Sequence, residues 1–203
     1  MRALILDGTL RPGDHVPQDD IAEELGISRI PVREALVALE REGWLSIEVH
    51  RGAFVGAIDE QFVRDHYDLF GTLYGFAARK AAANADADDL DAIAALEREL
   101  AACGDAEAAA TLAFDFHAAV VTASRSARLR LLLRAMSNLV PGNLFADVPG
   151  TLAIEQRGQA AIVRALRVGD GERAAAEYAT TMRDIGDQVV GLLCSRGILS
   201  RET

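Results

Sequence analysis

Residues 18–55 carry two short helical patterns followed by an alternating one, whereas residues 59–195 carry helical patterns only. Apolar residues that recur every three or four positions predict helices, and strict alternation of apolar and polar residues predicts strands. The change of pattern lies near residues 56–59. We therefore expect a mainly α protein of two domains: a small one at 1–56 that ends in a β-hairpin, and an all-α helical bundle at 59–203.

Turn residues divide the small domain into its elements. A helix is expected over 18–25, and Gly26 can adopt the left-handed conformation that ends it. A second helix follows at once, with Ser28 as its expected cap, and ends at Gly43. Its apolar stripe consists of Val32, Ala35, Leu36 and Leu39.

A β-hairpin is expected after the second helix. Leu45, Ile47 and Val49 alternate with polar residues, and the chain then turns into an apolar strand at 53–55. Two helices joined by a short turn around a glycine and followed by a hairpin form the winged helix-turn-helix pattern.

Caps and breaks mark the helices of the bundle. Asp59 can cap a long helix that runs to about residue 83, and turn residues separate the helices that follow. These helices are expected over 88–102, 106–123, 126–140, 150–168 and 171–195. A bundle of about six such helices can enclose a ligand pocket.

Charge and composition narrow the class of protein. The net charge of −10 argues against indiscriminate binding of nucleic acid, because Lys and Arg supply nearly all non-specific affinity for phosphate, so any DNA contact must be local. No apolar run approaches the roughly 20 residues that span a bilayer. The sequence does not open with a basic stretch followed by an apolar one, which is the pattern of a signal peptide, and Cys103 and Cys194 lack metal or redox spacing. We expect a cytoplasmic protein without a membrane partner.

Arg29 and Arg33 lie one helical turn apart at the start of the second helix, opposite its apolar stripe. Side chains in the N-terminal turn of a recognition helix read bases in the major groove of DNA. The spacing alone leaves two alternatives open. Either the arginines face a DNA groove, or they are solvated or paired with a nearby carboxylate.

The small domain resembles the GntR family of bacterial regulators over nearly its whole length. The resemblance rests on Pro12-Gly13, Ile21-Ala22, Leu25-Gly26, Ser28-Arg29, Pro31 to Leu36, Leu39-Glu40, Glu42-Gly43 and Arg51 to Val55. It implies that double-stranded DNA is a partner. The contacts that it implies are made by Ser28, Arg29, Ile30, Pro31 and Arg33 in the second helix and by His50, Arg51 and Gly52 at the wing tip.

Two further points concern this domain. Because it has no Cβ, Gly52 would let the backbone approach the sugar-phosphate wall of DNA. The family usually has a fuller first helix, of which only residues 2–6 stand here, before Gly8. Either the chain starts further upstream or the domain is slightly less stable than usual.

The helical part is similar to the FadR-like branch of the family, whose effector domain is called FCD. The similarity rests on Phe116-His117, Ile162, Ala165-Leu166, Gly169-Asp170 and Ala174. Many members of the branch bind a divalent metal with one Asp and three His, and these positions hold Ala113, His117, Gln159 and Thr181 here. Alanine cannot ligate, and Gln and Thr offer only weak neutral oxygens. We therefore expect no metal and no other cofactor.

The resemblance also implies an effector pocket in the bundle. Gly71 and Tyr74 stand where the branch commonly has Arg and Glu, which favours a less acidic and more apolar ligand. The expected effector-binding residues are Tyr74, His117, Asn138, Gln159 and Thr181, with Tyr178 as a further candidate. A lone His in an apolar helix is, however, more often a satisfied core residue, and Asn138 can cap a helix end.

The leading hypothesis is a ligand-responsive transcription regulator that binds a short pseudo-palindromic operator as a homodimer. We expect it to be a repressor. The apolar runs at 131–133 and 189–193 belong to the core or to the dimer surface. The alternative is a constitutive DNA-binding or partner-binding module with a filled bundle. An enzyme is less favoured, because the sequence places no second strong acid or base opposite His117.

Overall fold

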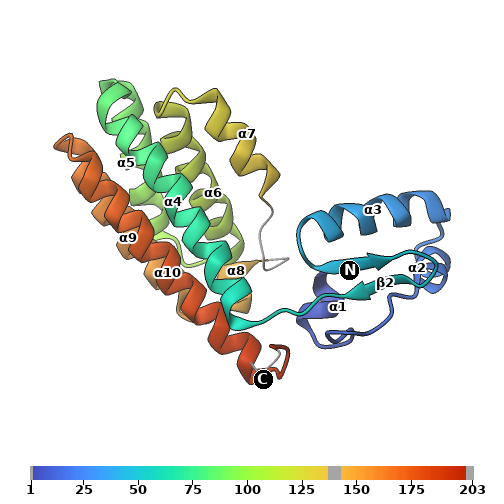
Figure 1. Cartoon of the computed structure of the whole chain (residues 1–203). Helices are drawn as coiled ribbons and strands as arrows, with labels where there is room; N and C mark the ends of the chain where they lie inside the picture. Colours follow the sequence, from blue (N-terminus) through green and yellow to red (C-terminus); the bar gives the residue numbers. More distant parts are fainter. Residues whose placement is uncertain (1, 137–142, 200–203) are drawn as a thin grey trace. The chain divides into compact units, whose positions relative to one another are not determined.

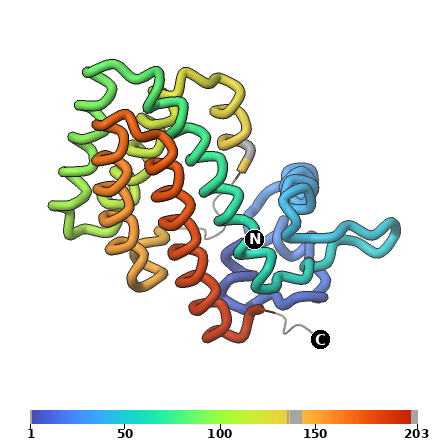
Figure 2. The backbone as a smooth tube through the Cα atoms, turned by 60° about the vertical axis from the view of Figure 1, so that its left-hand side comes forward, coloured from blue at the N-terminus to red at the C-terminus, as the bar shows by residue number. Residues whose placement is uncertain are grey.

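The computed structural model describes residues 2–136 and 143–199 and shows a mainly helical chain with one small sheet (Figures 1 and 2). It divides into two compact units, which we describe separately. Residues up to Phe62 form the first unit together with the stretch from Leu193 onward, and Val63–Leu192 forms the second. The domain boundaries expected from the sequence, 1–56 and 59–203, stay a prediction. No helix in the described part of the chain is long and apolar enough to cross a membrane.

The first unit contains α1 (Arg2–Leu6), α2 (Gln18–Glu24), α3 (Arg29–Arg41), β1 (Leu45–Glu48) and β2 (Gly52–Val55). Gly26 and Gly43 follow α2 and α3 with positive φ angles of 64° and 82°, so both act as the helix-ending residues that the sequence predicts. The buried face of α3 consists of Val32, Leu36 and Leu39, whereas Ala35, which was expected on the same stripe, is exposed. The predicted winged helix-turn-helix architecture is confirmed.

The hairpin of the first unit pairs Leu45 with Val55 and Glu48 with Gly52. Only part of its predicted apolar face is buried. Leu45 is buried, but Ile47 is 38% exposed, and Val49 lies in the turn with 81% of its surface exposed. A two-stranded hairpin by itself buries little of its surface. The alternating pattern therefore predicted more buried residues than the structure shows.

The second unit is an all-helical bundle. Its helices are α4 (Glu60–Asn84), α5 (Ala87–Ala102), α6 (Ala106–Ala123), α7 (Ala127–Ala135), α8 (Leu144–Asp147), α9 (Thr151–Arg167) and α10 (Gly171–Ser195), of which α4 and α10 extend into the first unit at one end. Asp59, Asp86, Asp105 and Ser126 accept hydrogen bonds from backbone N–H groups in the first turn of the helix that follows each of them. The helix expected over 126–140 ends at Ala135, and the sequence did not predict α8.

Small residues allow α4 and α10 to approach each other closely. A Cβ atom on Gly71 would lie 3.1 Å from the Cα of Ala179, and one on Gly75 would lie 3.3 Å from the Cβ of Ala175. Gly71 therefore faces a neighbouring backbone and is not among the residues that line the bundle cavity described below. The interpretation that Gly71 removes charge from the pocket was wrong, because its position is a helix contact.

Candidate functional site

The exposed face of α3 presents basic side chains. Arg29 and Arg33 are both exposed, and Ile30, between them in sequence, is 70% exposed. Ser28 takes the N-cap position, but its side chain makes no capping hydrogen bond, so the hydroxyl group is left for another partner. Pro31 is exposed in the first turn, where a missing N–H group breaks no intrahelical bond.

An ion pair joins α2 and α3, the two helices of the helix-turn-helix. The Nε atom of Arg29 lies 2.9 Å from a carboxylate oxygen of Asp19 in α2. The two side chains are 78% and 63% exposed, and such exposed pairs contribute about 0.2–1 kcal/mol. The sequence left a nearby carboxylate open as an alternative for this arginine. The observed pair is weak enough for a phosphate or a base to replace it.

The wing tip is held by contacts within the first unit. His50 adopts a left-handed φ of 64°, and the guanidinium group of Arg51 lies 5.3 Å from the ring centroid of Phe54 and pairs with Glu48. Gly52 has a φ of 96°, and a Cβ atom there would lie 2.7 Å from the His15 ring. Gly52 thus already has two intramolecular reasons to be glycine, besides the approach to DNA expected from the sequence.

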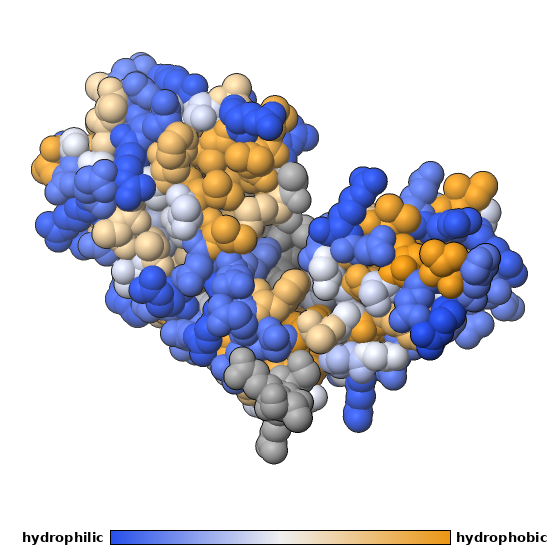
Figure 3. Space-filling view, in the orientation of Figure 1, coloured by the Kyte–Doolittle hydropathy of each residue, from blue (hydrophilic) through white to orange (hydrophobic). Residues whose placement is uncertain are grey.

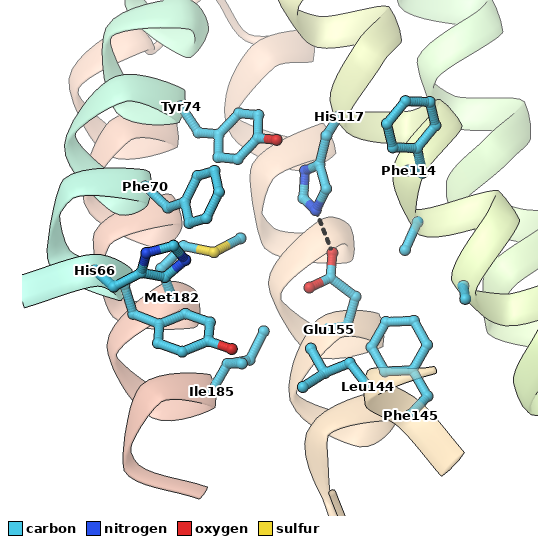
Figure 4. A pocket seen from close by; sticks show the side chains of 13 residues that line it. His66, Phe70, Tyr74, Phe114, His117, Leu144, Phe145, Glu155, Met182 and Ile185 are labelled. Atoms are coloured by element: carbon cyan, nitrogen blue, oxygen red, sulfur yellow. Dashed lines mark ion pairs between the residues drawn. The ribbon is translucent and has the colours of Figure 1, made fainter. Parts of the chain in front are cut away.

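A cavity of about 160 Å³ lies within the bundle, between α4, α6, α8, α9 and α10 (Figure 4). Its walls are mainly aromatic and aliphatic. The lining residues are His66, Tyr67, Phe70, Tyr74, Ala110, Ala113, Phe114, His117, Leu144, Phe145, Glu155, Met182 and Ile185. A neighbouring hollow of about 580 Å³ shares four of them and is lined further along by Arg130 and Arg134 of α7.

A buried acid–base pair lies in this cavity. The Nε2 atom of His117 is 3.0 Å from the Oε1 atom of Glu155, whose side chain is only 3% exposed (Figure 4). The other ring nitrogen, Nδ1, lies 3.3 Å from the hydroxyl group of Tyr178. Gln159 donates to the same Oε1 atom at 2.9 Å. The chain therefore places a carboxylate opposite His117, which the sequence alone did not reveal.

Burial and neighbouring charge act in opposite directions on Glu155. Burial raises the pKa of the carboxyl group, but the charge and hydrogen bond of His117 and the hydrogen bond from Gln159 together outweigh burial and lower the pKa below its ordinary value. Burial, helped by the charge of Glu155, raises the pKa of Tyr74 to about 12. The cavity thus combines an ionised carboxylate with a neutral phenol at neutral pH.

The structure brings together only some of the expected effector residues. Tyr74 and His117 line the cavity. Gln159 and Thr181 are buried but do not line it; Gln159 contacts Glu155, and the Thr181 hydroxyl donates to the Glu177 carbonyl oxygen. Tyr178 lies behind His117, and Asn138 falls outside the described residues.

The donors present do not fit the metal set of the FadR-like branch. Of its four positions, Ala113 has no donor, and Gln159 and Thr181 are engaged as described above. Among residues 2–136 and 143–199, no group of three His, Cys, Asp or Glu side chains could hold a metal ion. The absence of a metal stays a prediction.

Two domain families match this chain. Residues 1–55 match the family described as bacterial regulatory proteins, gntR family, and residues 65–184 match the FCD domain. These ranges cover the winged helix-turn-helix and most of the helical bundle.

Curated relatives carry regulator names. An uncharacterised HTH-type transcriptional regulator of Mycobacterium tuberculosis is 38% identical over 138 residues, which is 68% of this chain and 57% of the relative. A probable D-xylose utilization operon transcriptional repressor of Paenarthrobacter nicotinovorans is 33% identical over 185 residues, covering 87% of this chain and 79% of the relative. The chain thus spans little more than half the length of the first of these relatives.

Solved structures show the same fold. The McbR/YncC protein of E. coli aligns with a TM-score of 0.61 at 23% identity, over 97% of this chain and 94% of that one. A putative GntR regulator from Rhodococcus sp. RHA1 aligns with a TM-score of 0.57 at 26% identity, over 94% and 93%. Together with the domain matches, these similarities show that the chain belongs to the GntR family and carries an FCD domain.

Proposed function

We propose that the chain is a ligand-responsive transcriptional repressor of the cytoplasm. A homodimer binds a short pseudo-palindromic operator through α3 and the wing, and a small molecule in the bundle cavity changes its affinity for DNA. The observation that carries the proposal is the exposed basic face of α3 in a chain of net charge −10. The repressor name of the Paenarthrobacter relative supports the sign of regulation.

The proposed DNA contacts are those that the resemblance to the GntR family implies, and the exposure of Arg29 and Arg33 supports them. Arg29 and Arg33 enter the major groove, with Ser28, Ile30 and Pro31 against the backbone or base edges. His50, Arg51 and Gly52 place the wing tip against the adjacent phosphates. Tyr74 and His117 belong to the effector cavity, and we no longer assign Gln159 and Thr181 a direct contact with the effector, because they do not line the cavity.

Selection of genomic DNA fragments by the purified chain tests this proposal. We expect the retained fragments to share a two-fold symmetric motif whose half-sites lie about one helical turn apart, since each subunit presents one α3. Fluorescence anisotropy on the motif, with and without cavity ligands, then tests the response. Retention of fragments without a common motif would contradict a sequence-specific repressor.

An exposed apolar surface supports the homodimer. Leu69 and Phe76 on α4 are 55% and 47% exposed, and Leu131 and Leu132 on α7 are 60% and 46% exposed. Figure 3 shows apolar surface gathered over these two helices. Of the two apolar runs in the sequence, 189–193 contributes buried residues, whereas 131–133 is largely exposed. We therefore place the dimer contact on α4 and α7.

Replacing Leu69 and Phe76 together by Glu is expected to give a monomer, because four charges would face one another across the two-fold axis. Loss of the linked second half-site should then weaken operator binding by about tenfold or more. Sedimentation and anisotropy measure the two effects. Val168→Glu, which changes a 77% exposed apolar residue elsewhere, serves as the control. A stable dimer of the double variant would place the interface on another face.

Asp19→Asn is expected to strengthen operator binding about two- to fivefold, because the pair of Asp19 with Arg29 competes with DNA for the guanidinium group. Anisotropy at fixed salt measures the change. Asp20→Asn removes the same charge from the next residue, which is exposed and forms no ion pair within the described chain. Equal gains in both variants would mean that only the general charge matters.

The pair of Glu155 and His117 also bears on the enzyme alternative. An acid opposite a histidine is a feature of general acid–base catalysis. The described lining of the cavity contains no Ser, Cys or Lys nucleophile, and the Nε2–H group of His117 is directed at Glu155. We propose that this pair recognises a ligand and does not catalyse a reaction.

A further inference from the structure

The carboxylate of Glu155 is only half satisfied. Its Oε1 atom accepts hydrogen bonds from His117 and Gln159, at 3.0 and 2.9 Å. Its Oε2 atom has no donor among the described residues and points away from His117 into the cavity (Figure 4). A carboxylate oxygen in such a place gains more from a new donor than an exposed one does, because water screens it less.

The charges around the cavity favour a positive ligand over a negative one. The described lining contains no Lys or Arg, and the proton on Nε2 of His117 is already shared with Glu155. Besides His117, the described lining holds one other side chain that can carry a positive charge, His66 of α4, so an anion would meet an ionised carboxylate whose cationic partner is already engaged. Arg130 and Arg134 of α7 line the neighbouring hollow instead.

The aromatic walls of the cavity also favour a positively charged ligand. Phe70, Tyr74, Phe114 and Phe145 line the same cavity as the carboxylate, and Tyr74 stacks on Phe70 at 5.8 Å between ring centroids. The faces of such rings attract cations, by roughly 0.5–2 kcal/mol for each good contact. The volume of about 160 Å³ is close to that of an engineered cavity that holds benzene, at about 150 Å³.

We propose that the effector is a small organic cation. It is a primary or secondary ammonium on an apolar or aromatic body, and one of its N–H groups donates to the Oε2 atom of Glu155. The apolar body lies among the aromatic side chains. The inference rests on the proposed function only in taking this cavity as the effector site. It differs from a metal-assisted carboxylate ligand in the sign of the charge that the protein selects.

Titration calorimetry of the full chain, without DNA, tests the inference with three molecules of matched shape: benzylammonium, benzyl alcohol and benzoate. We expect saturable binding of benzylammonium and binding of the other two weaker by about tenfold or more, because a charge-assisted hydrogen bond is lost. Equal or tighter binding of benzoate would overturn the inference. So would saturable binding of Zn²⁺ or Ni²⁺ in competition with benzylammonium.

Two variants assign the effect to Glu155. Glu155→Gln is expected to weaken benzylammonium binding about 10- to 100-fold, whereas Glu172→Gln, on the exposed surface of α10, should leave binding unchanged. Unaltered affinity in Glu155→Gln would overturn the inference. If that variant does not fold, the ranking of the three ligands on the unmodified chain decides.

The same design separates this inference from the proposed function. Binding of benzylammonium is measured without DNA, so it can hold even where no operator is found. Conversely, release of operator DNA by a carboxylate ligand in this cavity would support a ligand-responsive repressor and overturn the inference about the charge of the ligand.

Discussion

Replacing Arg29 and Arg33 together by Ala is expected to weaken operator binding by about three orders of magnitude or more, because the homodimer loses four base or phosphate contacts of about 1–3 kcal/mol each. Both side chains are exposed, whereas the buried face of α3 consists of Val32, Leu36 and Leu39, so their removal should leave the core of the first unit intact. Anisotropy measures the loss, and thermal unfolding checks that the fold is unchanged.

Arg79→Ala supplies the matched control for that loss. Arg79 is an exposed arginine in α4, paired with Glu172 at 2.9 Å, and it lies in the second unit. Its replacement removes one of the two positive charges that the double variant loses, but no proposed DNA contact. The salt dependence separates the two cases further, since each lost phosphate contact lowers the slope of log affinity against log salt by about one. A double variant that binds like Arg79→Ala would refute the assignment of α3.

The winged helix-turn-helix unit could be predicted from the sequence because the residues that determine its helices and turns are close together in the chain. Gly26 and Gly43 end their helices within a few residues of the apolar stripe that each helix buries, and no distant contact is needed for either. The ion pair of Arg29 could not be assigned in the same way. Its partner Asp19 lies on another helix, and several other acidic residues of the first unit were equally plausible from sequence alone.

The bundle cavity shows where sequence reasoning stopped. The resemblance to metal-binding relatives directed attention to Gln159 and Thr181, and it gave no weight to Glu155, one turn before Gln159. One signal was available. Glu155 lies on the buried stripe of α9 with Thr151, Ile162 and Leu166, and a charged residue on an apolar stripe needs a partner. Which residue is the partner depends on packing of α6 against α9, which spacing does not specify.

His117→Ala is expected to lower the free energy of unfolding by about 3–5 kcal/mol, because it leaves the buried carboxylate of Glu155 without its main partner. Urea unfolding at fixed protein concentration measures the loss. Phe114→Ala, on the same helix and also lining the cavity, removes packing without unpairing a charge, and Phe114 is 69% exposed. This control should lose less than about 1 kcal/mol.

The pH dependence shows whether the unpaired charge is the cause. In the unmodified chain the pKa of Glu155 is lowered from 4.5, so its contribution to stability is present above that value and is lost as the pH falls through the lower folded-state pKa. Without His117, burial dominates and should raise the pKa instead. The pH dependence of the stability then has the opposite sign. The variant loses stability as the pH rises from about 5 to 8, because the buried carboxyl group must ionise there.

Glu155→Gln in the His117→Ala background removes the charge itself. The double variant is therefore expected to recover at least about 1 kcal/mol relative to His117→Ala at neutral pH and to lose the added pH dependence. Equal stability of the single and double variants, at both ends of the pH range, would mean that His117 acts through packing with Tyr74 and Tyr178. Recovery would show that the cavity holds its negative charge only because His117 stands opposite it.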